Sequence, residues 1–218
     1  ADFGPQGDVA SHLVNLFYTA LQTHCDHPRV ATFFAEWDRI FGIVYGEELG
    51  QAEKDAPELA ALYRTVGDRK GAPLLKPLFF AVHTYYALLM KFLAVELASL
   101  QGGALVGSFV AALPAMTDKQ LRRELTNLEN GGTFALLGIN NFLEGDFFGW
   151  YLDAWDQPCE GSEPSQGSLA DGIRALARTL ADFEPATTTL EPEHTRDLLK
   201  KLYQYLVPQK LRHDLGEY

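Results

Sequence analysis

Apolar positions recur at three- and four-residue steps along most of the chain, which is the spacing of one buried face of an α-helix. The first of these runs comprises Val9, Leu13, Leu16, Phe17 and Ala20. Either Asp8 or Ser11 is expected to cap that helix, because a side-chain oxygen there can accept hydrogen bonds from backbone N–H groups. A second helix is expected to begin at Pro28, where a missing N–H costs little. Its apolar face is rich in aromatic residues: Val30, Phe33, Phe34, Trp37, Phe41 and Val44.

Later helices carry start signals of their own. Capping-box spacing, in which a polar cap is followed three positions on by a reciprocating side chain, occurs at residues 55–58 and 117–120. A Ser–Asp pair at residues 168–171 precedes another apolar series, and a last helix is expected at about 193–206. Residues 134–155 are aromatic and interrupted by glycine, which predicts short helices and turns.

The longest helical run, at about residues 73–100, is apolar on nearly every face and is therefore expected at the centre of the fold. Its exception is a narrow stripe of polar and small residues: His83, Thr84, Ala87, Lys91 and Ala94. Charged residues leave only 14 positions, Pro77 to Met90, free of Lys and Glu, whereas a membrane span needs roughly 20 mostly apolar residues. We therefore expect a buried helix and no membrane partner.

Strand signals are weak, since no alternating run of useful length and no internal repeat is visible in the sequence. The pattern predicts an all-α fold, a multi-helix domain around the long helix. Residues 1–207 are assigned to this helical domain. Residues 156–168, which are rich in Ser, Gly and Pro, are expected to form a surface loop or a loop insertion within it.

Composition narrows the class further. The chain has 218 residues, of which 47% are hydrophobic and 22% charged, so one compact domain with a sizeable core is expected. Two cysteines provide no disulfide framework and suit a cytoplasmic location. Eighteen Lys and Arg against 29 Asp and Glu give a net charge of −11. That balance argues against binding nucleic acid unaided, because phosphate contacts dominate such affinity.

Motifs for nucleotide and acyl chemistry are absent from the sequence: there is no Gly-x-Gly, no phosphate-binding P-loop and no Gly-x-Ser-x-Gly elbow. The His-Cys-Asp-His run at residues 24–27 is interpreted as a polar helix end, since adjacent helical residues point in different directions. Glu191 and His194 match half of a carboxylate di-iron motif, and its second half is missing. We assign no metal site and no catalytic residue.

Polar residues in apolar surroundings have either a structural or a chemical role. They are His83, Thr84 and Lys91 on the long helix, and Glu144, Asp146, Asp153 and Asp156 among the later aromatic residues. His83 and Lys91 are about two helical turns apart and so share a face. Paired carboxylates can serve acid–base catalysis. We favour structural roles, because buried polar groups need hydrogen-bond partners.

The C-terminal sequence is Leu-Lys-Lys-Leu-Tyr-Gln-Tyr-Leu-Val-Pro at residues 199–208, then Leu-Arg-His-Asp-Leu-Gly-Glu-Tyr at residues 211–218. It resembles the end of the N-terminal helical region in N6-adenine DNA methylases of restriction–modification and related phage-defence systems. In that family a Gly-Glu-Tyr-Tyr-Thr-Pro block opens the methyltransferase fold, and the present sequence ends within that block. Residues 208–218 are therefore expected to begin the junction to a methyltransferase domain that these residues do not contain.

Three further stretches carry the same resemblance, in the order that the family would show. They are Phe34-x-x-Trp37-x-x-Ile40-Phe41 with Tyr45-Gly46-Glu47, His83-Thr84-Tyr85 with Leu88, Leu89 and Lys91, and the aromatic segment from Gly138 to Tyr151. The resemblance implies that the parent protein binds S-adenosyl-L-methionine and methylates adenine N6 in DNA, with the target base flipped out of the duplex.

The family's cofactor and amino-group loops, Phe-x-Gly-x-Gly and Asn-Pro-Pro-Tyr, do not occur in these 218 residues. We therefore expect this fragment to be inactive and to hold no cofactor alone. Gly216, Glu217 and Tyr218 match part of the block that packs beside the cofactor, and would bind it only within the full-length parent.

The resemblance implies an accessory domain that supports its own C-terminal methyltransferase domain and contacts DNA, a nuclease or a specificity subunit. The preferred DNA-proximal candidates are Lys200, Lys201, Lys210 and Arg212, which adjoin the catalytic junction. Other basic groupings are Arg64 with Arg69 and Lys70, and Arg122 with Arg123. Solvated helix faces also produce such groupings. The alternative is a free-standing acidic helical module that binds a protein through the aromatic residues 134–155.

Overall fold

The computed structural model describes residues 3–45, 54, 56–65, 74–101, 107–140, 147–155 and 167–182. Within these ranges the regular structure is helical, so the all-α prediction is confirmed for the described part of the chain. The elements are α1 (Asp8–Thr23), α2 (Pro28–Tyr45), α4 (Ala56–Leu62), α5 (Leu75–Gln101), α6 (Phe109–Ala112), the 3-10 turn η2 (Leu113–Ala115), α7 (Asp118–Glu129), α8 (Gly132–Leu136), the 3-10 helix η3 (Phe148–Leu152) and α9 (Leu169–Asp182).

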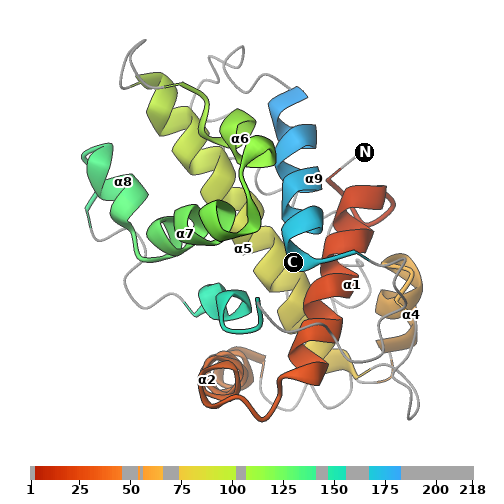
Figure 1. Cartoon of the computed structure of the whole chain (residues 1–218). Helices are drawn as coiled ribbons and strands as arrows, with labels where there is room; N and C mark the ends of the chain where they lie inside the picture. The colour runs from red at the N-terminus through yellow and green to blue at the C-terminus, as the bar shows by residue number, and fades with distance from the viewer. Residues whose placement is uncertain are drawn as a thin grey trace.

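The long helix predicted at about residues 73–100 is α5, and it lies at the centre of the fold (Figure 1). It contacts α1, α2, α4, α6 and η3. Because neighbours surround it, residues on several of its faces are buried, among them Leu78, Phe80, Tyr85 and Phe92. By length and composition alone the segment Leu75–Ser99 could cross a membrane, and 67% of its most apolar window is buried inside the fold. Packing within the fold thus accounts for most of its apolar surface.

Helices α1 and α9 pack closely beside one another (Figure 1). The contact depends on Gly172, because a Cβ there would lie 2.7 Å from Leu16 Cδ1 and 3.0 Å from Leu13 Cδ1. On α9, Ile173, Leu176 and Leu180 are buried at the spacing that the sequence predicted.

Two of the predicted helix starts are confirmed. The Thr117 side chain accepts from the backbone N–H of Gln120, and the Gln120 side chain accepts from the backbone N–H of Thr117 at 3.0 Å, which completes a capping box. Ser168 Oγ accepts from the backbone N–H of Asp171 at 3.1 Å. These caps form as predicted because each bond joins residues three positions apart.

The predicted cap of the first helix is wrong. Gly7 occupies the N-cap and makes no side-chain capping bond. Asp8 is the first helical residue, and its carboxylate accepts from the Arg64 guanidinium at 2.8 Å. Ser11 is already inside the first turn, where its hydroxyl donates to the Asp8 carbonyl. The Asp8 carboxylate, which the local pattern assigned to capping, thus forms a long-range ion pair with Arg64 instead.

The helix that starts near residue 56 ends at Leu62. Arg64 adopts a φ of +53°, and the Thr65 N–H donates to the Ala60 carbonyl at 2.7 Å, which closes the helix. Val66 lies outside the described residues, as do the predicted loop at 156–166, the predicted helix at 193–206 and the junction at 208–218.

Candidate functional site

The polar stripe of α5 lies inside the fold, where it meets α2, α7 and η3. His83, Thr84 and Lys91 each contact a side chain from another element.

His83 is held in a group of aromatic rings. The Trp37 indole N–H donates to His83 Nδ1 at 3.1 Å, and the ring centroids of Phe79 and Phe41 lie 4.4 and 5.3 Å from that of the imidazole. Burial lowers the pKa of His83 to about 4, so the imidazole is neutral near pH 7. A neutral ring with Nδ1 as acceptor is the form that the indole donor requires.

Thr84 uses its hydroxyl both as donor and as acceptor. It donates to the Phe80 carbonyl at 2.8 Å and accepts from the Trp150 indole N–H at 2.9 Å. Trp150 is fully buried, and its ring also lies edge-on to Phe17 of α1, with 6.0 Å between centroids. This contact attaches η3 to the centre of α5.

Lys91 forms a buried ion pair with Glu129 at the end of α7, and the two side chains are only 5% and 6% exposed. The other carboxylate oxygen of Glu129 accepts from the Tyr151 hydroxyl at 2.8 Å. One carboxylate thus joins α5, α7 and η3. Charge pairs as enclosed as this one are stable only when their remaining lone pairs are also satisfied, as they are here.

The stripe therefore builds the core. His83 accepts from Trp37, Thr84 accepts from Trp150 and Lys91 pairs with Glu129, so each of these bonds joins α5 to another element. The sequence did not single out Glu129, because it lies beside the leucines of α7 with no motif of its own. Trp37 stood out only as part of an aromatic stripe, and the sequence did not indicate that it reaches His83.

Most other predicted site residues lie outside the part of the chain that the structure describes: Glu144, Asp146, Asp156, Lys200, Lys201, Lys210, Arg212, Gly216, Glu217 and Tyr218. Asp153 lies in the described part of the chain, where its carboxylate forms an ion pair with Arg29 at 3.2 Å. Among the described residues, no three His, Cys, Asp or Glu side chains gather in a way that could hold a metal ion. In the run at residues 24–27, Cys25 is an exposed free thiol, and burial and His27 lower the pKa of His24.

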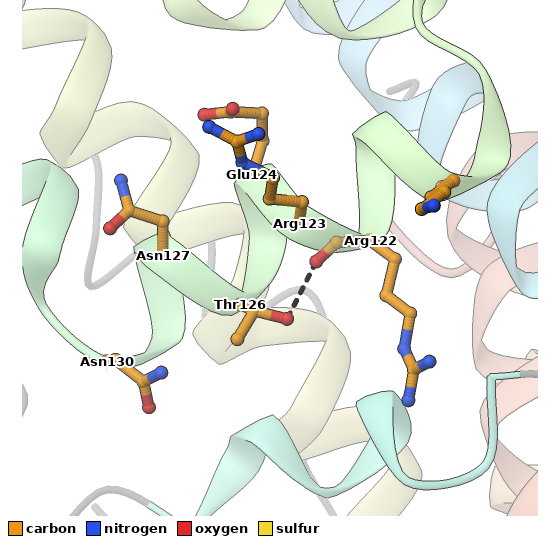
Figure 2. Close-up of a pocket in the computed structure, with 7 residues that line it drawn as sticks. Arg122, Arg123, Glu124, Thr126, Asn127 and Asn130 are labelled. Atoms are coloured by element: carbon orange, nitrogen blue, oxygen red, sulfur yellow. Dashed lines mark hydrogen bonds between the residues drawn. The ribbon is translucent and has the colours of Figure 1, made fainter.

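The outward side of α7 forms a shallow hollow of about 600 Å³ (Figure 2). It is lined by Lys119, Arg122, Arg123, Glu124, Thr126, Asn127 and Asn130. Arg122 extends toward η3 and donates to the Leu152 carbonyl at 3.1 Å, while Thr126 donates to the Arg122 carbonyl at 2.8 Å. A second hollow of about 210 Å³ shares part of this lining and adds Arg29 and Phe33 of α2.

Comparisons of this chain with protein-family models, with curated proteins and with solved structures found no match.

Proposed function

We propose that this chain is the N-terminal helical accessory domain of an S-adenosyl-L-methionine-dependent adenine-N6 DNA methyltransferase of a restriction–modification or related defence system. In this proposal the domain supports a C-terminal catalytic domain in the cytoplasm and is itself inactive. The proposal starts from the sequence resemblance, and the packing of the described residues adds a physical argument for it.

The observation that carries the proposal is that the stretches with the resemblance meet at α5. Trp37 from the first stretch bonds to His83 of the second, and Trp150 from the third bonds to Thr84 across 66 positions of sequence. Residues that lie far apart in the sequence and contact one another in the core form a folding unit. The stretches with the resemblance thus belong to one packed domain, which is what the proposal requires of them.

S-adenosyl-L-methionine would bind in the proposed catalytic domain, and Gly216, Glu217 and Tyr218 would lie at the edge of that site. The DNA-proximal patch at Lys200, Lys201, Lys210 and Arg212 stays a prediction for the same full-length protein. The described residues have a supporting role in this proposal, which is consistent with the engaged polar groups of the α5 stripe.

The alternative, a free-standing module that binds a partner through aromatic residues 134–155, has less support. Phe134, Trp150 and Tyr151 are fully buried, so their rings are used inside the fold. Among the described residues of that segment, Leu136 is 84% exposed and Ile139 37% exposed, and two separate apolar side chains are ordinary on a protein surface.

The test is to read the gene beyond the codon for Tyr218, express the complete reading frame, and measure N6-methyladenine in DNA by mass spectrometry of its nucleosides. We expect Phe-x-Gly-x-Gly and Asn-Pro-Pro-Tyr loops downstream and methylation that requires S-adenosyl-L-methionine. The 218-residue chain should give none. A variant with Ala for the Asn of the Asn-Pro-Pro-Tyr loop is the control. A reading frame without these loops would overturn the proposal and leave the partner-binding module, to be tested by pull-down.

A further inference from the structure

The outward face of α7 combines cationic and hydrogen-bonding side chains in a way that the proposed function has not used. We define the α7 face as Lys119, Arg122, Arg123, Thr126, Asn127 and Asn130. We propose that the α7 face contacts the phosphate backbone of duplex DNA. This inference rests on the proposed function and adds a contact surface that is separate from the C-terminal patch.

The geometry of α7 places these residues outside. Leu121, Leu125 and Leu128 are fully buried, which fixes the rotation of the helix against the core. Lys119 and Arg123 are one turn apart on the opposite side and are exposed. Figure 2 shows Arg122 and Arg123 leaving α7 in different directions, so the cations are spread over the face.

Two cations of this face, Lys119 and Arg123, are available to an outside anion. Several other cations of the described residues are held by carboxylates: Arg64 by Asp8, Lys76 by Asp38, Lys91 by Glu129 and Arg174 by Asp118. The described part of the chain supplies no such carboxylate to Lys119 or Arg123. Two exposed cations one helical turn apart, on a chain with a net charge of −11, provide a local charge complementary to a polyanion.

Several acidic residues near the α7 face are already paired with cations. Asp118 is paired with Arg174, Glu129 with Lys91, and Asp153 with Arg29. Glu124 is the acidic side chain that lines the hollow itself. Arg174 is shared between Asp118 and Asp171, so the positive charge of the α7 face depends on Lys119 and Arg123.

The shape and chemistry favour a phosphate backbone over a protein partner. Arg122 is positioned by its bond to Leu152, and the hollow continues into the smaller one that Arg29 lines. The α7 face has polar and charged side chains throughout, whereas protein interfaces depend on buried aromatic or apolar anchors. Arginine, lysine, threonine and asparagine are the side chains that position proteins on DNA phosphates.

The experiment uses the protein expressed from the complete reading frame and measures binding of a fluorescent duplex DNA by anisotropy at several salt concentrations. The test variants are K119E/R123E and the milder K119Q/R123Q, and Arg122 stays intact because it also bonds to Leu152. The control, K54E/R178E, makes the same change in net charge at exposed positions outside α7. Circular dichroism checks that all variants fold.

For K119E/R123E we expect roughly tenfold weaker binding at about 0.1 M salt, and a salt slope smaller by about two, because each phosphate contact releases about one counterion. K119Q/R123Q should show the same slope change with a smaller loss of affinity, and the control should bind as the unmodified protein does. Equal losses in test and control variants would overturn the proposal, since net charge alone would explain them. Unchanged binding in a protein that still methylates adenine would overturn this surface and leave the proposed function standing. Absence of methylation would instead count against the proposed function.

Discussion

Lys91 and Lys119 are residues of the same type in opposite environments, one buried and one exposed. Lys91 points from α5 into the core, where Glu129 and Tyr151 complete a nearly solvent-free network. Lys119 is exposed on α7, and the described residues give it no carboxylate. The difference shows that the buried charge of Lys91 holds elements of this protein together, whereas the charge of Lys119 faces solvent.

The same contrast holds for the polar groups around them. In the α5 stripe, indole N–H groups bond to His83 and Thr84, and loss of either partner leaves a buried polar group without its hydrogen bond. On the α7 face, water replaces any partner that is removed. Substitutions at matched positions should therefore differ strongly in their effect on stability.

The largest effect is expected at the buried ion pair. Lys91→Met leaves the Glu129 carboxylate enclosed without its cation, and should lower the free energy of unfolding by about 3–5 kcal/mol. Lys119→Met, on the exposed face, should change it by less than about 0.5 kcal/mol. Urea unfolding of the 218-residue chain measures both. Similar values for the two variants would contradict the difference between these regions.

The buried imidazole of His83 should make the free energy of unfolding depend on pH. Its pKa is lowered from 6.5 to about 4 in the folded protein by burial, so between these values the unfolded chain binds a proton that the folded chain does not. The free energy of unfolding should therefore fall as the pH drops from 6.5 toward 4. The loss amounts to about 3 kcal/mol, since one pKa unit corresponds to about 1.4 kcal/mol.

The control for this prediction is His83→Gln, which keeps a side-chain acceptor near the Trp37 indole and removes the titration. Urea unfolding at about pH 7 and about pH 4.5 should show a smaller loss in this variant than in the unmodified chain. If both lose the same amount, the carboxylates of the protein and not His83 produce the acid sensitivity.

The smallest of these effects is expected at the threonines. Thr84→Val removes the acceptor of the buried Trp150 N–H and should cost about 2 kcal/mol. Thr126→Val, at an exposed position of α7, should cost less than about 0.5 kcal/mol, because that hydroxyl bonds only within its own helix in the structure. Thermal unfolding of the two variants compares them directly, and a larger loss at Thr126 would reverse the interpretation.

The sequence by itself determined the local features of this protein. The 3.6-residue spacing predicted the helices and the central position of α5, and the caps at Thr117 and Ser168 formed as expected. These features depend on residues within one or two turns of each other, so their energies are set by neighbours along the chain. The same reasoning selected His83, Thr84 and Lys91 as polar positions on one stripe of that helix.

Only the tertiary structure decided the partners of those residues. Trp37 and His83 are 46 positions apart, Lys91 and Glu129 are 38, and Asp8, expected as a cap, pairs with Arg64 at a distance of 56 positions. Helical spacing shows which residues share a face, but it does not show which face of which other helix lies opposite. That choice depends on how all the elements pack at once, so Glu129 and the orientation of the α7 face became visible only in the folded chain.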